Sequence, residues 1–414
     1  MNTIVLRNIY FVAAAVLLSL VTTLSRAAEG RDSTRAVGFA YDVNFEMNFD
    51  NTEYRTSLYP SMTIFGARLT PAVGLSVVQA NGMHHRLMAG IDVMKDFGRN
   101  PVGPEQIAAA GGETVPNPEA STRQNNWNLF GEILLYYKWD ASFRKTDLTM
   151  TAGIFPRSTA ATYPRAFFSD SLRFYDNNLE GLLLQFRRPK SYYEVGIDWM
   201  GMFGKYRRER FMLFSSGKSR IKPYLSLGWY FTMYHYACSE VAMGVVDNVL
   251  ANPYVNFDFA LWTPFQKLSL TLGWLQGAQQ DRKLVGKYVF PCGGEAEFEI
   301  RKWNVGIVDR LFVGRNMMPY YNSLDPGGYK YGRELYPGDP MYRLHEDGNV
   351  SSLGIYDRLE VYYEPRIASF LDLRVELAVH FHSTGYSGFQ QRLSLIFNLQ
   401  ELLGSSRSGK KLHK

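Results

Sequence analysis

Residues 37–49 alternate between apolar and polar positions without a break. The odd positions are apolar or aromatic from Val37 to Phe49, and the even positions are small or polar, among them Asp42 and Glu46. Successive side chains of a strand point to opposite faces, so this segment predicts a strand with one apolar and one polar face. Its length exceeds the usual strand of about 5–6 residues and suits a strand that crosses a bilayer at a tilt, which needs about 9–11 residues.

The same alternation recurs along the chain and predicts about 16 strands. Pro71 interrupts the second of them without changing the phase of the pattern, which predicts one strand with a kink or bulge. The expected strands are 36–49, 59–79, 86–97, 126–140, 147–156, 175–187, 191–201, 206–215, 221–236, 252–262, 267–275, 295–308, 311–318, 351–364, 369–384 and 388–400.

The connections between these strands alternate in length, as they do in outer-membrane barrels. Long loops are expected at 98–125, 157–174, 237–251, 276–294 and 319–350, and short turns near 81, 143, 189, 218, 265, 309 and 367. The pattern predicts an all-β fold, a single transmembrane antiparallel β-barrel of about 16 strands with short periplasmic turns and long extracellular loops. The even number places both ends of the barrel on the periplasmic side.

A soluble β-sandwich or propeller is the alternative, because alternation alone does not exclude it. The length of the strands and the placement of two tryptophans argue against it. Trp127 and Trp139 share a face of one predicted strand. At about 3.3 Å per residue and a tilt near 40°, they are separated by roughly 30 Å of height. That height approximates the distance between the two aromatic girdles of a membrane barrel.

The first residues predict an export signal. Arg7 precedes an apolar stretch at 9–21, and Ser25-Arg26-Ala27 forms a small-x-small cleavage site. Residues 1–27 are therefore expected to be a signal peptide, 28–402 the outer-membrane barrel, and 403–414 a basic, disordered tail. A transmembrane anchor is the alternative for the first segment, but its apolar stretch is short for one.

The net charge of +6 comes entirely from the two ends of the chain. Removing the signal segment and the tail leaves a barrel body without net charge, so the basic balance is no argument for binding nucleic acid or for an anion-selective pore. The expected partners are outer-membrane lipid, the barrel-assembly machinery and small solutes. A homo-oligomer is compatible with the pattern, because lipid-facing and subunit-facing strands look alike.

Taken together, the signal, strands and alternating loops resemble those of Gram-negative porin-like outer-membrane β-barrel proteins. The resemblance covers nearly all of the mature chain and is one of pattern, so it identifies no subfamily. It implies an outer-membrane location and assembly by the barrel machinery. Many such barrels end in an aromatic residue, whereas residues 400–414 extend here past Phe397, which leaves the mode of assembly-signal recognition open.

If the apolar face of each strand meets lipid, the charged positions of the opposite face line the lumen. A lysine or arginine facing lipid at mid-membrane would cost about 2–4 kcal/mol. The lumen-lining set predicted in this way is Asp42, Glu46, Arg68, Asp92, Glu132, Lys138, Glu194, Asp198, Asp258, Arg358, Glu360, Asp372, Arg374, Glu376 and Arg392. These residues can form a charged constriction in a water-filled pore, or a structural salt-bridge network that stiffens or plugs the lumen.

Two other groups of residues have open interpretations. The loop 319–350 is rich in tyrosine, which suits sugar binding or a constriction, although a surface loop packed on its own side chains is the simpler interpretation. Cys238 begins one long loop and Cys292 ends another, so a disulfide between them is expected. Two unpaired thiols are the alternative, because sequence supplies no distance.

The evidence for catalysis and metal binding is weak. His235, His380 and His382 lie near the outer ends of strands, where barrel hydrolases can work, but serines and aspartates are plentiful nearby by chance and no G-x-S-x-G occurs. The pair His84-His85 has no further metal ligands nearby in sequence. We therefore expect no enzyme, cofactor or metal. The leading hypothesis is a porin-like channel for passive diffusion of small hydrophilic solutes; a non-conducting barrel for adhesion, surface-polymer handling or envelope structure is second, and an outer-membrane hydrolase is third.

Overall fold

The computed structural model describes residues 35–97, 106–108, 114–116, 128–205, 207–241, 243–325, 328, 330–345 and 351–398. The predicted signal peptide, the basic tail and Trp127 lie outside these residues. Among the described residues, no helix is long and apolar enough to cross a bilayer.

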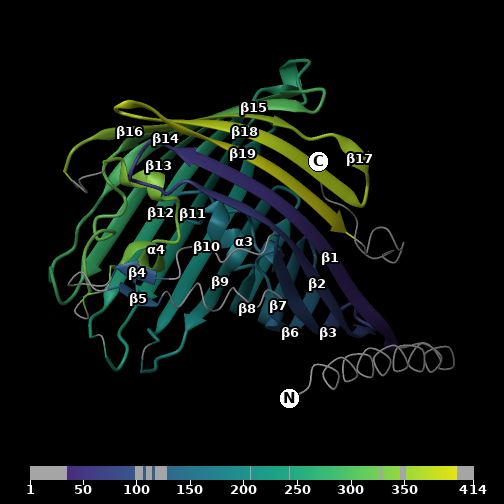
Figure 1. Ribbon diagram of the computed structural model, residues 1–414. Helices are drawn as coiled ribbons and strands as arrows, with labels where there is room; N and C mark the ends of the chain where they lie inside the picture. Colours follow the sequence, from purple (N-terminus) through teal and green to yellow (C-terminus); the bar gives the residue numbers. More distant parts are fainter. Residues whose placement is uncertain are drawn as a thin grey trace.

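Sixteen antiparallel strands form one closed barrel, as the alternation predicts (Figure 1). Closure follows because β1 pairs with β2 on one side and with β19 on the other. The barrel strands are β1 (Arg35–Tyr54), β2 (Met62–Gln79), β3 (His84–Asp96), β6 (Asn128–Phe143), β7 (Thr146–Pro156), β8 (Asn178–Arg188), β9 (Ser191–Gly201), β10 (Arg210–Lys222), β11 (Leu225–Tyr236), β12 (Val246–Asp258), β13 (Lys267–Asp281), β14 (Cys292–Lys302), β15 (Val305–Gly314), β16 (Gly354–Tyr363), β18 (Leu371–His382) and β19 (Gly385–Asn398).

A few short elements lie outside this wall. The strands β4 (Gln106–Ala108) and β5 (Thr114–Pro116) form a small hairpin, and β17 (Arg366–Ala368) lies in a turn. The helices are α3 (Asp170–Tyr175) and α4 (Gly332–Leu335), with 3₁₀ turns at Arg157–Thr159, Ala260–Trp262 and Pro340–Arg343.

The second predicted strand is confirmed as a single strand. Pro71 lies within β2 opposite Val43 of β1, and the register to β3 is the same before and after the proline. Thr70 and Pro71 have no pairing partner in β3, but the register does not shift across them. The pairing therefore contains no bulge at the proline. The predicted tight turn at Asn81-Gly82 is also present, with Gly82 at a φ of 81°.

The long connections fall on one end of the barrel, as predicted, and the short connections on the other, except that the two-residue connection between β18 and β19 lies at the end with the long ones. The short connections join β2–β3, β6–β7, β8–β9, β10–β11, β12–β13, β14–β15 and β16–β18, and we call this end the turn side. The other end, the loop side, carries the long connections, among them residues 157–177 and 315–353. In outer-membrane barrels the short turns are periplasmic and the long loops extracellular.

Two predicted short turns are misplaced, and the predicted loop at 237–251 includes the first residues of β12. The turn expected near 218 lies at 223–224, because Gly217 is needed within β10 for a close approach: a Cβ there would lie 2.3 Å from the Trp229 ring. The turn expected near 309 lies at Trp303 and Asn304, which have φ values of 51° and 68°. Neither position is glycine or proline, so Asn304, which tolerates positive φ, is the one turn signal there.

The outer wall carries an apolar belt between two aromatic zones. Exposed leucines, isoleucines and valines occupy its middle, including Leu135, Ile133 and Leu272. The exposed aromatic residues on the turn side include Phe143, Tyr224, Trp262, Trp303 and Tyr363, and those on the loop side include Phe97, Trp199, Tyr288, Phe290 and Tyr386. This arrangement is that of a lipid-embedded outer-membrane barrel, and it confirms the porin-like architecture. Trp139 lies in β6 on the same face as Ile133 and Leu135.

Candidate functional site

Two long connections fold back into the barrel and fill its loop-side half. We call residues 157–177, between β7 and β8, the inner loop, and residues 315–353, between β15 and β16, the plug loop. Both α3 of the inner loop and α4 of the plug loop lie within the ring of strands (Figure 1).

Charged groups fix the inner loop to wall strands on both sides of β7 and β8. At its start, Arg157 contacts Asp198 of β9 at 3.0 Å, and the Ala161 N–H donates to Glu194 at 3.0 Å. At its end, Arg68 of β2 donates to the Phe174 carbonyl and also pairs with Asp92. These contacts hold the loop across the lumen.

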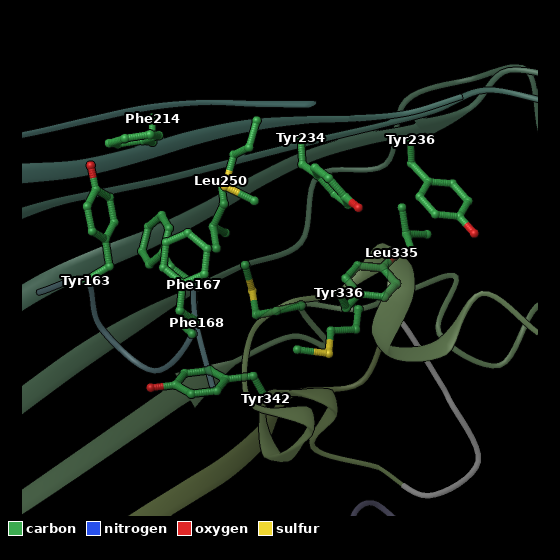
Figure 2. Packing of buried hydrophobic residues seen from close by; sticks show 14 of the residues in the cluster. Tyr163, Phe167, Phe168, Phe214, Tyr234, Tyr236, Leu250, Leu335, Tyr336 and Tyr342 are labelled. Carbon is green, nitrogen blue, oxygen red and sulfur yellow. The ribbon is translucent and has the colours of Figure 1, made fainter. Parts of the chain in front are cut away.

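Aromatic packing reinforces both loops. Tyr163, Phe167 and Phe168 of the inner loop gather near Phe214 of β10, while Leu335 and Tyr336 of the plug loop lie near β11 (Figure 2). The Tyr163 ring packs against Phe214 and Tyr230, with ring centroids 6.0 and 5.3 Å apart. Burial of these rings stabilises the loops inside the barrel by the hydrophobic effect.

Tyrosine hydroxyls anchor the plug loop to the wall. Tyr336 donates to Gln279 at 2.7 Å, Tyr331 to Asp281 at 2.8 Å, and Tyr342 to Glu295 at 3.1 Å. The five described tyrosines of this loop are buried. Three of them reach the barrel wall, so the expectation of a surface loop packed only on its own side chains is wrong.

The two loops also bind each other. Arg165 of the inner loop pairs with Asp339 of the plug loop at 3.2 Å and with Asp170 of its own loop at 2.5 Å. The Asp339 N–H donates to the Arg165 carbonyl at 2.8 Å, and the Ser169 N–H donates to the Pro337 carbonyl at 2.9 Å. Movement of one loop would consequently disturb the other.

A network of arginines and carboxylates lines the wall from β14 to β19. Arg310 contacts Glu297 at 2.7 Å and Glu360 at 2.8 Å. Arg358, which is 1% exposed, pairs with both Glu360 and Glu376. Alternation brings these groups to the same face, and register places Arg392 directly opposite Glu376.

The network continues into the inner loop. Arg392 contacts Asp170 of α3 at 3.0 Å, and Arg374 contacts Glu364 at 2.9 Å and Glu376 at 3.2 Å. Burial would raise the pKa of Asp170, but Arg165 and Arg392 outweigh it and hold that pKa well below its usual range. Asp170 therefore stays ionised and ties the inner loop to β19.

Cavities remain in the lumen between the described residues. One of them, the inner cavity, has a volume of about 630 Å³ and is lined by the arginine–carboxylate network together with Lys218, Asp258 and Lys267 near the turn side. A side cavity of about 380 Å³ lies between the inner loop and the wall of β1 and β19. A third, of about 310 Å³, is lined by Asp42, His84, Arg86 and Lys138.

All the predicted lumen-lining residues except Asp372 fall into three groups in the structure. Arg358, Glu360, Arg374, Glu376 and Arg392 form the network; Arg68, Asp92, Glu132, Glu194 and Asp198 contact the inner loop or β8; Asp42, Glu46, Lys138 and Asp258 line cavities. Asp372 is exposed at the turn-side end of β18, in register with Arg366.

Several residues of the lumen are missing from the predicted set. Arg157, Arg165, Asp170, Arg173 and Asp339 belong to loops, for which alternation gives no facing. Arg310 is missing because the expected turn near 309 removed it from a strand. Glu295, Glu297 and Glu299 alternate along β14, so their signal was present in the sequence.

The expected disulfide between Cys238 and Cys292 is absent, and both residues are free thiols. Cys238 follows β11 by two residues, whereas Cys292 begins β14. The strands β12 and β13 lie between them, so three strand spacings of about 4.8 Å separate the two positions by roughly 14 Å. A disulfide needs Cα atoms within about 7 Å.

The three histidines singled out for catalysis lie in different environments. His380 is buried and contacts the Tyr356 hydroxyl at 2.9 Å. His382 contacts Ser387 Oγ at 2.8 Å and the Met341 carbonyl at 3.1 Å, so this Ser–His pair is buried beneath the plug loop. His235 lies on the outer wall, where its Nδ1 contacts Asp247 at 3.3 Å.

His235 and Asp247 belong to a polar strip at the loop-side rim. Arg282 holds Asp247 with two hydrogen bonds of 2.6 and 3.0 Å. The His235 ring stacks on Phe211 at 4.9 Å, and Phe211 stacks on Trp199 at 5.5 Å. Among the described residues, no hydroxyl donates to His235, and no cluster of three His, Cys, Asp or Glu side chains suits a metal ion.

A protein-family profile described as lipid A 3'-O-deacylase-type matches residues 32–247. The chain belongs to this family. The match spans the strands from β1 to β11 and ends at Asp247, the second residue of β12.

Comparison with curated proteins finds no match. Among solved structures, the chain is similar to OccAB3 of Acinetobacter baumannii, with 11% identity, coverage of 87% of this chain and 98% of the other, and a TM-score of 0.42. It is also similar to a loop-deletion mutant of OmpT from Vibrio cholerae (7% identity, 87% and 99% coverage, TM-score 0.43). A third is OpdK of Pseudomonas aeruginosa with vanillate (9% identity, 87% and 98% coverage, TM-score 0.37).

Proposed function

We propose that this protein is a porin-like channel in which the inner loop and the plug loop restrict passage of small hydrophilic solutes. The observation that carries the proposal is the inner cavity of about 630 Å³, which is lined by charged side chains from at least five strands. A barrel of about 16 strands is wide enough for an aqueous channel. Charged rings in such a channel set which solutes pass.

The arginine–carboxylate network explains why such a channel would be narrow rather than sealed. Its charges are paired across the wall, from β14 through β19, and leave the middle of the inner cavity empty of protein. Closure on the loop side instead rests on the two loops. Their movement would join the inner cavity to the exterior, so we infer a channel that is mostly closed and opens by loop displacement.

Planar bilayers test this function. Purified, folded protein should produce discrete conductance steps, whereas protein unfolded by boiling should not. Folding is checked on the same sample by heat-modifiable migration on a denaturing gel. An absence of steps from folded protein would rule out the channel.

A second candidate is hydrolysis of an ester of an outer-leaflet lipid, which the family match favours. His235 and Asp247 both fall within the matched residues and lie on the outer wall at the loop-side rim. Nε2 of His235 would accept a proton from water as the hydroxide adds to the acyl carbonyl, and would return it to the departing sugar alkoxide. Asp247 would hold the Nδ1–H of the ring.

Incubation of the purified protein with lipid A tests this candidate through the release of fatty acid. Activity that His235→Gln abolishes would support it. The matched control is His85→Gln, which changes an outward-facing histidine near the turn side. No release from folded wild-type protein, or release that His235→Gln leaves unchanged, would exclude this assignment.

A further inference from the structure

The side cavity contains two opposite charges that the protein leaves unpaired. Arg173 of α3 and Glu46 of β1 both line this cavity. Arg173 donates to the carbonyl of Tyr163, and Glu46 accepts from Asn48. Neither takes part in any ion pair among the described residues, although the lumen around them is rich in ion pairs.

The neighbours of Arg173 already have carboxylate partners. Arg157 pairs with Asp176 and Asp198, and Arg165 with Asp170 and Asp339. Burial lowers the pKa of Arg173. The nearby charge of Asp170 opposes this shift, and the charge of Arg165 adds to it. A half-buried guanidinium crowded by other cations gains most from an additional anion, since charge-assisted hydrogen bonds are the strong ones.

Asp50, Arg157, Asp170 and Arg392 also line the side cavity, each in an ion pair, and most of its remaining exposed wall is apolar. Ile64, Phe174, Leu179, Phe214 and Ile396 come from β2, the inner loop, β8, β10 and β19. Its volume of about 380 Å³ lies within the range of small-molecule sites, which are mostly apolar with a few polar groups that fix the ligand. A ligand for this cavity must therefore combine an apolar body with charge.

We infer that the side cavity binds a small zwitterion with an apolar body, of the class of apolar amino acids and short apolar peptides. Arg173 binds the carboxylate, Glu46 binds the ammonium group, and the apolar side chains lie against Ile64 and Ile396. A purely anionic ligand leaves Glu46 facing a like charge, and a purely cationic ligand does the same to Arg173.

This inference rests on the proposed function in one respect, because it names the class of solute that a channel would admit. The side cavity and the inner cavity share Thr162, Tyr163, Asp170, Arg173 and Arg392 in their linings. A ligand held at Arg173 would therefore lie next to the inner cavity.

Calorimetric titration of the detergent-solubilised full chain with the dipeptide L-leucyl-L-leucine tests the site. Its N-acetyl derivative lacks the ammonium group and its C-terminal amide lacks the carboxylate. The dipeptide should bind saturably, and each blocked derivative about tenfold or more weakly, because each loses one charge-assisted contact.

Two variants assign the charges. Arg173→Gln should weaken dipeptide binding by about tenfold or more and remove the difference between the dipeptide and its amide. Glu46→Gln should remove the difference between the dipeptide and its N-acetyl derivative. Arg187→Gln is the control, because Arg187 shares the inward face of Gln185 in β8 and does not line the side cavity.

The inference is overturned if the dipeptide shows no saturable binding, if blocking either terminus changes nothing, or if Arg187→Gln weakens binding as much as Arg173→Gln. If Arg173→Gln does not fold, the blocked derivatives and Glu46→Gln still test the binding site. Conductance without dipeptide binding would overturn the binding site but not the channel. Dipeptide binding without conductance would overturn the channel but not the binding site.

Discussion

At the scale of single residues, Asp170 shows how one carboxylate fixes a loop inside the barrel. It contacts Arg165 of its own loop and Arg392 of β19, and Arg165 in turn reaches Asp339 of the plug loop. Its loss would leave two half-buried guanidiniums with one partner fewer each. Asp170 therefore adds to the contacts that hold both inward loops in place.

Asp170→Asn should lower the free energy of unfolding at pH 7 by as much as about 3–5 kcal/mol, the range for breaking a buried ion pair. Because the pKa of Asp170 is held below its usual value, its stabilising effect is complete above the unfolded pKa of about 3.9 and is lost as pH falls toward the folded pKa. Denaturant unfolding should give a constant difference between wild type and variant from pH 8 to about pH 5. A difference that vanishes by pH 6 would contradict this assignment.

The facing of strand residues could be predicted, and the facing of loop residues could not. Glu376 and Arg392 fall on the polar phase of their strands, so alternation alone turns them inward. Arg173 and Asp170 have no such phase, because whether a loop folds into the lumen depends on tertiary packing of rings such as Tyr163 against Phe214. The side cavity and its Arg173 could not be predicted from the sequence for this reason.

At the scale of elements, strand number and order follow from the sequence, and strand ends follow less well. A two-residue turn is recognised by residues that favour positive φ, and Gly82 supplies that signal. Trp303 and Asn304 adopt positive φ without glycine, so the turn was predicted near Asp309 instead. Arg310 was therefore assigned to a turn and left out of the predicted lumen-lining residues. Conversely, Gly217 signals a turn but serves close packing against Trp229.

Because β11 and β14 are separated by two strands, Cys238 and Cys292 are expected to remain free thiols. Cys238 and Cys292 should both react with a maleimide in unfolded, unreduced protein, giving two labels per chain, because the strands between them keep the thiols apart. Mass spectrometry counts the labels. Labelling that requires prior reduction would show that the disulfide exists after all.

At the scale of the whole molecule, the apolar belt and the filled lumen invert the arrangement of a soluble protein. Apolar side chains such as Leu135, at 55% exposure, lie on the outer wall, while Arg358 is 1% exposed inside. In lipid this arrangement is favourable, because the belt meets hydrocarbon and the charges find partners in the lumen.

Leu135→Arg should destabilise the folded barrel in lipid vesicles by about 2–4 kcal/mol, since the side chain faces the bilayer near the middle of β6. Leu353→Arg is the matched control, because Leu353 is 71% exposed just before β16 on the loop side. Unfolding in urea from the vesicles measures both. Equal effects of the two substitutions would argue against a lipid-facing belt.

The channel account is tested most directly by the conductance of a variant whose plug loop is shortened. Residues 317–344 would be replaced by a Gly-Ser linker, which the barrel should tolerate because β15 and β16 pair directly from Val305–Tyr363 to Gly314–Gly354. Deletion of residues 283–287, which are exposed outside the lumen, is the control. The account predicts a severalfold larger single-channel conductance for the shortened plug loop and no change for the control. Folded protein whose conductance is the same with and without the plug loop would contradict it.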